Sequence, residues 1–275
     1  MRKSTALSFA FVLILIELAC PSALGQPSRT ANAWDFKLTP YLWIPELDTD
    51  SRLGGLSGSA EMDFSDFLDL VDFAGSARLE AWKQKWGLLF DALYVDLGAD
   101  YSKVVGPGGR IATNADADFR QALLDFGLAY RLIDTPVGKG EDQRLTFEPL
   151  AGVRYAYLKA ELRLDVAVAG IGGVGTRLGG SEDWVEPFVG FRLWWHLNDK
   201  LSTGVRTDFG GFGIGSASGL TWNFLAGVDY QLSSGMSIEA GYRILDIDYE
   251  GGSGRSAIGL DGQMRGPIVG LAFYF

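Results

Sequence analysis

The last ten residues, Gly266-Pro267-Ile268-Val269-Gly270-Leu271-Ala272-Phe273-Tyr274-Phe275, decide the fold. Apolar side chains stand at every second position of this stretch: Val269, Leu271, Phe273 and Phe275. A period of two is typical of a β-strand with one apolar face, and such a strand needs a sheet to complete it. Soluble domains usually end on polar, frayed residues, whereas this chain ends on an aromatic one. We therefore expect the chain to end in a strand of a larger sheet.

The same alternation recurs through the chain. Nine further segments show it: 34–43, 75–83, 86–97, 119–132, 145–157, 184–197, 201–209, 220–232 and 236–247. The positions assigned to their apolar faces hold no Asp, Glu, Lys or Arg, and one such charge at a bilayer midplane costs about 2–4 kcal/mol. Short connections alternate with longer ones at 45–73, 98–115, 165–182, 211–218 and 250–259. Short turns on one side of a membrane and long loops on the other are typical of a transmembrane barrel.

The fold class predicted from this pattern is all-β. We expect a transmembrane, antiparallel, up-and-down β-barrel of about ten strands, within a range of roughly 8–12, with both chain termini in the periplasm. Only a closed barrel lets strands cross a bilayer, because lipid cannot satisfy an open sheet edge. The net charge of −10 makes nucleic acid an unexpected partner.

The N-terminus has the features of a cleaved secretory signal. Arg2 and Lys3 precede an apolar run at 6–16, and Ala23-Leu24-Gly25 fits a cleavage site. A membrane anchor helix and a lipoprotein cysteine at Cys20 are the alternatives, but the apolar run is short and Glu17 interrupts it. We expect a signal peptide at 1–25, a short lead at 26–33 and a single barrel domain at 34–275.

Charges of both signs fall on the inward faces. They form the predicted lumen network: Lys37, Arg78, Asp91, Asp125, Glu148, Arg154, Glu186, Arg192, Arg206, Asp208, Asp229, Glu239 and Arg243. A two-residue turn at Gln84-Lys85 predicts that Arg78 lies opposite Asp91. The turn at 233–235 sets Asp229 opposite Glu239, which requires an arginine such as Arg206 or Arg243 between them. We interpret the network as structural, and the alternative is a narrow pore lined by the same groups.

Several other features need an interpretation. The acidic segment 45–72 is expected to be a solvated loop, with a divalent-cation site or a lumen plug as alternatives, and Ser65 to cap a short helix in it. Prolines at 40, 149, 187 and 267 are expected near strand ends or at bulges. Gly170 to Gly175 matches G-x-G-x-x-G but no helix opens there, so we expect a flexible loop. His196, the only histidine, has no evident Ser or Cys partner.

From Trp184 onward, and in one short stretch near its start, the chain resembles a widespread group of uncharacterised proteobacterial outer-membrane barrel proteins. The matching residues are Pro40-Tyr41-Leu42-Trp43, Trp184-Val185-Glu186-Pro187, Gly190-Phe191-Arg192, Asp208 to Gly213, Gly241-Tyr242-Arg243 and the segment from Gly266 to Phe275. The terminal strand resembles the assembly signal of such barrels, in which Val269, Leu271, Phe273 and Phe275 would be read by the barrel-assembly machinery. The resemblance implies an outer-membrane location, outer-membrane lipids and periplasmic chaperones as partners, and no substrate.

The expected role is that of a non-enzymatic surface or narrow-channel protein without cofactor or metal. Two alternatives stay open. One is a membrane-embedded hydrolase with carboxylates at the outer rim, for which Asp63 and Asp208 are the candidates. The other is a soluble periplasmic binding protein with a barrel or sandwich fold.

Overall fold

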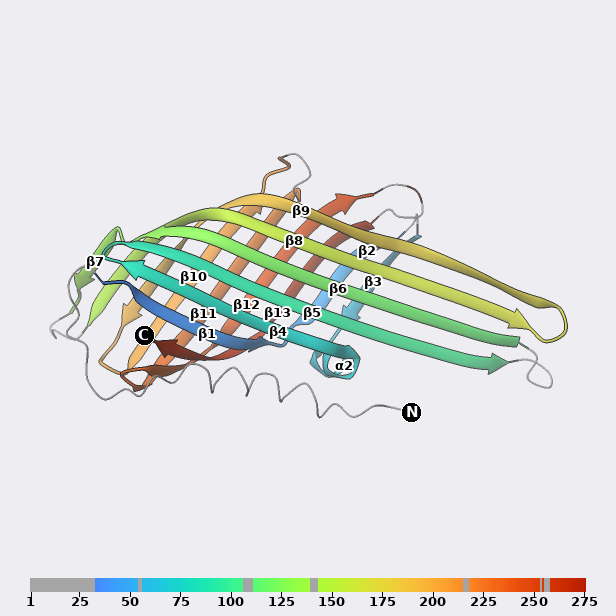
Figure 1. The fold of residues 1–275 in the computed structure, drawn as a ribbon, viewed down its shortest axis with the longest axis horizontal. Coiled ribbons are helices and arrows are strands. Elements are labelled where there is room, and N and C mark those ends of the chain that lie inside the picture. The colour runs from blue at the N-terminus through green and yellow to red at the C-terminus, as the bar shows by residue number, and fades with distance from the viewer. Residues whose placement is uncertain are drawn as a thin grey trace. The chain divides into compact units, whose positions relative to one another are not determined.

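An antiparallel sheet closed on itself forms the wall of the unit Trp34–Phe275, as seen in the computed structural model (Figure 1). The structure describes residues 33–53, 56–105, 111–138, 143–214, 218–252, 254 and 258–275. Its strands are β1 (Asp35–Trp43), β2 (Glu46–Leu53), β3 (Leu56–Met62), β4 (Val71–Lys83), β5 (Trp86–Val105), β6 (Ile111–Tyr130), β7 (Ile133–Pro136), β8 (Arg144–Val168), β9 (Gly172–His196), β10 (Leu201–Gly211), β11 (Leu220–Ser233), β12 (Met236–Gly251) and β13 (Ile258–Tyr274). The signal peptide and most of the lead predicted at 1–33 lie outside the described residues.

Ten strand positions make the closed wall, as predicted. β1 pairs with β4 on one side and with β13 on the other, so the sheet has no edge at this join. Both ends of the wall segment lie beside the short turns, since Asp35 pairs with Trp82 and Lys37 pairs with Tyr274. We call this the turn end of the barrel and the opposite one the hairpin end.

The strand position next to β13 is shared by two strands. β1 pairs with one part of β13 and β2 with the other part, and Ile44 and Pro45 lie between β1 and β2. After the β2–β3 hairpin, the short helix α2 (Phe64–Leu70) stands between β3 and β4. The predicted acidic loop at 45–72 is therefore wrong for most of its length, because polar side chains on the outer face disguise two paired strands. The helix was predicted, but its N-cap is Asp63 rather than Ser65.

Four strands continue beyond the rest of the wall at the hairpin end. We call the outer parts of β5, β6, β8 and β9, at 98–105, 111–118, 161–168 and 172–180, the extension (Figure 1). The sequence predicted loops at 98–115 and 165–182, and the structure corrects this. Aspartate, arginine and glycine on the outer face hide a continuing alternation, whose inner face is mostly alanine, leucine and valine but also holds Tyr101, Lys103 and Thr176. The predicted flexible loop at Gly170 to Gly175 is reduced to a turn before β9.

The prolines do not lie at strand ends or bulges. Each stands inside a strand, at a point where the ladder is interrupted on one side only. The interruption lies toward β13 for Pro40, toward β6 and β7 for Pro149, toward β10 for Pro187, and between the pairings with β1 and β2 for Pro267. The missing N–H group of proline therefore costs no ladder hydrogen bond at these positions.

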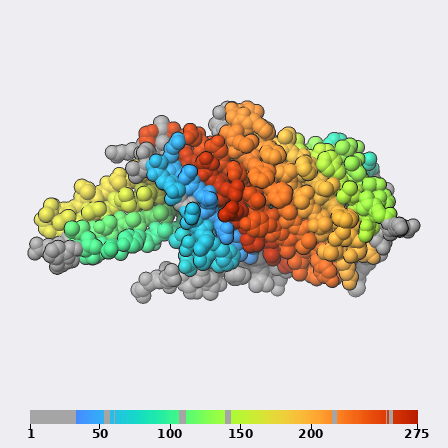
Figure 2. All heavy atoms as spheres, turned by 180° about the vertical axis from the view of Figure 1, so that it is seen from behind, coloured from blue at the N-terminus to red at the C-terminus, as the bar shows by residue number. Residues whose placement is uncertain are grey.

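The outer face of the wall is apolar between two charged margins. Phe126, Val153 and Val189 are among the large side chains exposed on it. Outward charges begin at Lys83 toward the turn end, and at Asp96, Lys159 and Asp246 toward the hairpin end. Figure 2 shows the opposite side of the molecule, where β13 (red) lies beside β2 (blue). Among the described residues, no helix has the length and hydropathy to cross a membrane.

The cap of α2 carries a testable pH dependence. The Asp63 carboxylate accepts hydrogen bonds from the Ser65 hydroxyl at 2.7 Å and from the N–H groups of Ser65 and Asp66 at 2.9 and 3.1 Å. These bonds lower the pKa of Asp63 below its ordinary value of 3.8, and the bond from the Ser65 hydroxyl has the largest effect. A lowered pKa means that the cap stabilises the helix above the ordinary value, and that this stabilisation is lost as the pH falls through the folded value.

We expect the hydrogen-exchange protection of Phe64–Leu70, measured by mass spectrometry and corrected for the intrinsic exchange rate at each pH, to fall as the pH is lowered through this range. Asp63→Asn should remove the pH dependence while keeping the cap, because asparagine caps as well as aspartate. Asp63→Ala removes the cap at every pH, so Phe64–Leu70 should have low hydrogen-exchange protection already at neutral pH. Equal protection in all three proteins would contradict this role of Asp63.

Candidate functional site: the charged lumen

A belt of charged side chains crosses the middle of the lumen. Every predicted lumen residue points inward, and all of them are buried except Lys37 and Glu239, which are partly buried. Glu80 and Arg131, which the sequence alternation also places on the inward face, join this charge belt. Acidic and basic side chains nearly balance within it, so that each charge can be neutralised by neighbours.

Arg154 is the most enclosed cation, with a side chain that is 1% exposed. Its guanidinium donates to both oxygens of Asp125, at 2.7 and 2.9 Å, and to Asp208 at 2.8 Å. Glu186 lies 3.6 Å away on the remaining side. Asp208 also accepts a hydrogen bond from Asn223 at 2.8 Å. This arrangement brings residues from four strands together around one arginine.

A second group forms closer to the turn end. Arg192 donates to Glu80 at 2.9 Å and to Glu148 at 2.7 Å. Arg131 reaches the other oxygen of Glu148 at 3.1 Å, and its guanidinium lies 4.4 Å from the ring centre of Trp82. The Trp82 indole N–H donates to Glu80 at 3.0 Å. The inward alternation of β6 continues to Arg131, which is the signal that places this residue in the network.

The facing carboxylates Asp229 and Glu239 are bridged by a cation from another strand. The register sets them opposite each other, as the turn predicts. The bridge is Lys37, whose Nζ lies 3.0 Å from Asp229 and 2.5 Å from Glu239, and neither Arg206 nor Arg243. Sequence reasoning missed this because β1 meets β11 and β12 only across the lumen.

The predicted pair of Arg78 and Asp91 is in register, with 3.6 Å between Nε and Oδ2. Asp91 also accepts the hydroxyl hydrogen of Tyr41 at 2.6 Å. The Tyr41 oxygen in turn accepts from Arg243 at 3.1 Å, and Arg243 donates to Asn223 at 2.9 Å. Neutral Tyr41 and Asn223 thus connect charges that do not touch directly.

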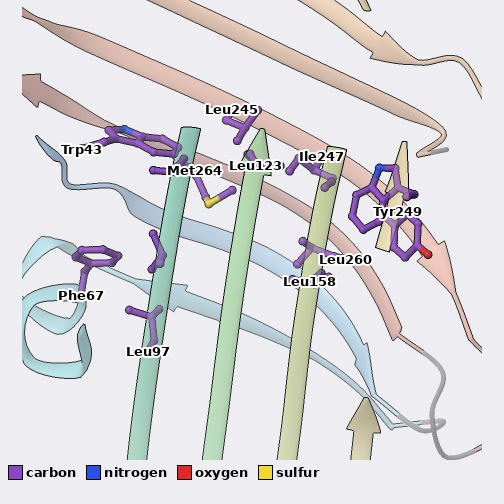
Figure 3. Packing of buried hydrophobic residues seen from close by; sticks show 14 of the residues in the cluster. Trp43, Phe67, Leu97, Leu123, Leu158, Leu245, Ile247, Tyr249, Leu260 and Met264 are labelled. Atoms are coloured by element: carbon purple, nitrogen blue, oxygen red, sulfur yellow. The ribbon is translucent and has the colours of Figure 1, made fainter. Parts of the chain in front are cut away.

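An apolar plug fills the lumen on the hairpin side of the belt (Figure 3). We define it by the buried residues Tyr41, Trp43, Phe67, Leu93, Val95, Leu97, Leu123, Ala156, Leu158, Trp184, Leu245, Ile247, Tyr249, Ile258, Leu260, Met264 and Ile268. Phe67 enters it from α2, so the acidic segment does contribute a side chain to a plug. Trp184 stacks on Tyr249 with ring centres 3.8 Å apart and also donates to Glu186 at 3.0 Å.

Glycines on the inner wall make room for large aromatic side chains. A Cβ at Gly152 would lie 2.7 Å from the Phe188 ring, and one at Gly204 would lie 2.5 Å from the Trp194 ring. A cavity of about 40 Å³ remains beside Gly204, lined by Arg78 and Glu239 among others. Its volume is that of a few water molecules. The described lumen is therefore filled rather than open.

The residues considered for catalysis already have other partners. Asp208 is neutralised by Arg154 and Arg206, and Asp63 caps α2. His196 does have a serine partner, since its Nδ1 lies 2.8 Å from the Ser202 hydroxyl, which corrects the prediction. Among the described residues no hydrogen bond joins the other ring nitrogen to a carboxylate, and no group of acids, histidines or cysteines there is placed to hold a metal ion.

The terminal strand has the alternation that the sequence predicts. Val269, Leu271 and Phe275 are exposed on the outer face, and Phe273 is half-buried there. Phe275 exchanges two backbone hydrogen bonds with Phe36, at 2.9 and 3.1 Å, and their rings stack 5.7 Å apart. The end of the chain is thus held in the closed wall.

No protein-family model matches the sequence, and no curated protein matches it significantly. Among solved structures, the outer membrane protease OmpT from Escherichia coli is similar at 9% identity, covering 91% of this chain and 99% of that one, with a TM-score of 0.49. Ail, the attachment invasion locus protein of Yersinia pestis, matches at 11% identity over 88% and 99%, with a TM-score of 0.35. The translocator domain of the autotransporter NalP from Neisseria meningitidis matches at 14% identity over 98% of both chains, with a TM-score of 0.37. These likenesses concern the fold alone.

Proposed function

We propose that this chain is a non-enzymatic, integral outer-membrane β-barrel whose lumen is closed to ions and which presents the extension at the cell surface. The observation that carries the proposal is the filled lumen. A belt of paired charges blocks apolar molecules, and the apolar plug behind it blocks ions. A conducting barrel needs a continuous polar path. Here the charge belt and the apolar plug occupy the lumen in succession, with a cavity of about 40 Å³ inside the belt and a larger one of about 450 Å³ beside the β2–β3 hairpin, on the hairpin side of the plug.

The membrane location is supported by the apolar outer wall. A closed barrel satisfies every ladder hydrogen bond within hydrocarbon, and an apolar face of this kind would be a liability in water. The basic start, apolar run and small-residue site of the signal at 1–25 support export, and the short turns support a periplasmic position for both termini. The interaction of the terminal strand with the barrel-assembly machinery belongs to the same proposal, as does membership of the proteobacterial barrel group.

Single-channel recording in a planar lipid bilayer tests the closed lumen. We expect the purified, folded protein to give no discrete conductance steps at any voltage that the bilayer withstands. A reproducible step that scales with salt concentration would instead establish the narrow channel. A gel shift between unheated and boiled samples provides the control, because it shows that the protein tested is a folded barrel.

A charge on the outer wall tests the membrane location. Val189 is 53% exposed in the middle of β9, and we expect Val189→Arg to lower the free energy of unfolding in lipid vesicles by about 2–4 kcal/mol. Val174→Arg on the extension of the same strand is the matched control and should change it by less than about 0.5 kcal/mol. Similar small effects for both variants would argue for the soluble periplasmic alternative.

Export and assembly are tested on the intact chain. N-terminal sequencing of the protein from outer-membrane fractions should begin at Gln26. Deleting Phe275 should lower the amount of heat-modifiable protein in that fraction while the precursor is still processed. Unprocessed protein, or normal assembly without Phe275, would remove the signal peptide or the assembly signal from the proposal.

A further inference from the structure

The extension leaves two rows of backbone hydrogen-bonding groups without a ladder partner. Among the described residues, β5 pairs with β4 only as far as Leu97, and β9 pairs with β10 only from Phe188 onward. Free edges of this kind are templates for another strand, and proteins usually protect them. The β9 edge at 172–180 has no proline and no inward charge, since its inner positions are glycine, valine, threonine and leucine.

The charges on the outer face of the extension are segregated across the strands. One row, read through the registers from β5 to β9, contains Asp100, Asp116, Arg163 and Arg177. Asp100 and Asp116 are neighbours at one end of this row, and Arg163 and Arg177 are neighbours at the other. Like charges on adjacent strands repel each other, which is unfavourable. Arg163 and Arg177 share the Glu161 carboxylate, whereas Asp100 makes no ion pair within the described part of the chain. Among the residues that the structure describes, Asp100 is therefore the end of the row without an opposite charge, whereas Arg177 is already paired with Glu161 and has no neighbouring strand on its other side.

A second copy of the chain supplies a neighbouring strand to each edge and an opposite charge to Asp100. Copies in one membrane have the same orientation, and β5 and β9 run in opposite directions, so a β5 edge meets the β9 edge of another copy as an antiparallel pair. Continuing the row across such a contact would set Arg177 of the neighbouring copy beside Asp100. Along the joined row, two aspartates would then follow two arginines in turn, and Asp100 would have an arginine beside it.

The strand tilt brings the two edges within reach. Barrel strands tilt by about 40°, so a strand that continues for about eight residues moves sideways by roughly 17 Å. The extension accordingly projects well past the other strands in one direction (Figure 1). A sheet that projects on one side only favours a head-to-tail contact over a two-fold symmetric one.

We propose that the extension joins copies of this chain head to tail, with the β5 edge of one copy paired to the β9 edge of the next. This inference goes beyond the proposed closed barrel, because it assigns the surface strands a partner. A soluble peptide or a lipid on these edges would leave the charge row unmatched.

Cysteine cross-linking in membranes tests the contact. The only cysteine, Cys20, lies in the predicted signal peptide. Tyr101 and Thr176 occupy one inner-face row at the two edges, so we expect Tyr101→Cys and Thr176→Cys to give a cross-linked dimer when co-expressed and none when expressed separately. Asp261→Cys, exposed on β13, replaces either partner as the control. No dimer in the mixture, or equal dimer from one variant alone, would overturn the proposal.

Charge exchange in the same assay separates the contact from effects on folding. Asp100→Arg places an opposite charge beside Asp116 within its own chain, but a like charge against Arg177 of the neighbouring copy. We expect the cross-linked fraction to fall about two- to fivefold, which corresponds to one exposed ion pair. Adding Arg177→Asp in the same chain should restore it. An unchanged fraction in the single variant, or no recovery in the double one, would contradict the proposed register.

Discussion

Replacing Arg154 with methionine is expected to lower the free energy of unfolding by about 3–5 kcal/mol. The substitution leaves Asp125, Asp208 and Glu186 around an uncharged side chain at a site closed to water. Removing one partner of a buried ion pair is costly because the charge that remains has lost both its counter-ion and its hydration. Urea unfolding in vesicles, followed by tryptophan fluorescence and by gel mobility, measures the change.

Two further variants identify the cause. Arg163→Met on the same strand removes an arginine whose side chain is 44% exposed, and it should cost less than about 1 kcal/mol. Adding Asp208→Asn to Arg154→Met should recover part of the loss, because it removes one of the stranded charges. Equal losses at Arg154 and Arg163 would mean that the belt does not stabilise the barrel.

Replacing Trp184 with alanine should have a comparable effect on stability, about 3–5 kcal/mol, and should also loosen the plug. The indole is buried, stacks on Tyr249 and donates to Glu186. Its loss leaves a void beside Tyr249 and removes one hydrogen bond from the buried Glu186 carboxylate. We expect the same urea titration to detect the destabilisation. Planar bilayers should show brief openings that the parent protein lacks.

Trp195→Ala is the matched control, because this tryptophan lies on the same strand but 44% exposed on the outer face. It should lose less stability and gain no conductance. If Trp184→Ala stays silent in the bilayer although it is destabilised, the charge belt alone closes the lumen. If it keeps its full stability, the plug is not the packed core described above.

Much of the wall could be predicted because one constraint repeats along it. A lipid-facing position excludes charge, so the period of two in Val185, Val189 and Phe191 sets both the strand and its facing. Short turns then fix the register, which is why Arg78 opposite Asp91 could be foreseen from the Gln84-Lys85 turn. The extension escaped prediction because no lipid constrains its outer face, and residues such as Asp116 and Arg163 resemble a loop.

The contacts across the lumen could not be predicted for a different reason. Pairing along a sheet follows from register, whereas contact across a barrel depends on its diameter and on the length of each side chain. Lys37 reaches Asp229 over 192 positions of sequence, with no turn to relate them. The plug was not predicted because the inward faces of β5, β9 and β12 mix leucine and tryptophan with charged residues. The sequence alone does not show that these apolar side chains meet in the lumen.

The join between the first and last strands is sparsely bonded, since the ladder between β1 and β13 is interrupted at Pro40 and gives way to β2 beyond Trp43. β1 nevertheless sends Lys37 and Tyr41 through the interior to β11, β12 and β5. Parting the two strands would drag a lysine away from two carboxylates. Contacts inside the lumen therefore hold the first strand in place. The barrel cannot open between β1 and β13 without also breaking the ion pairs that neutralise its interior.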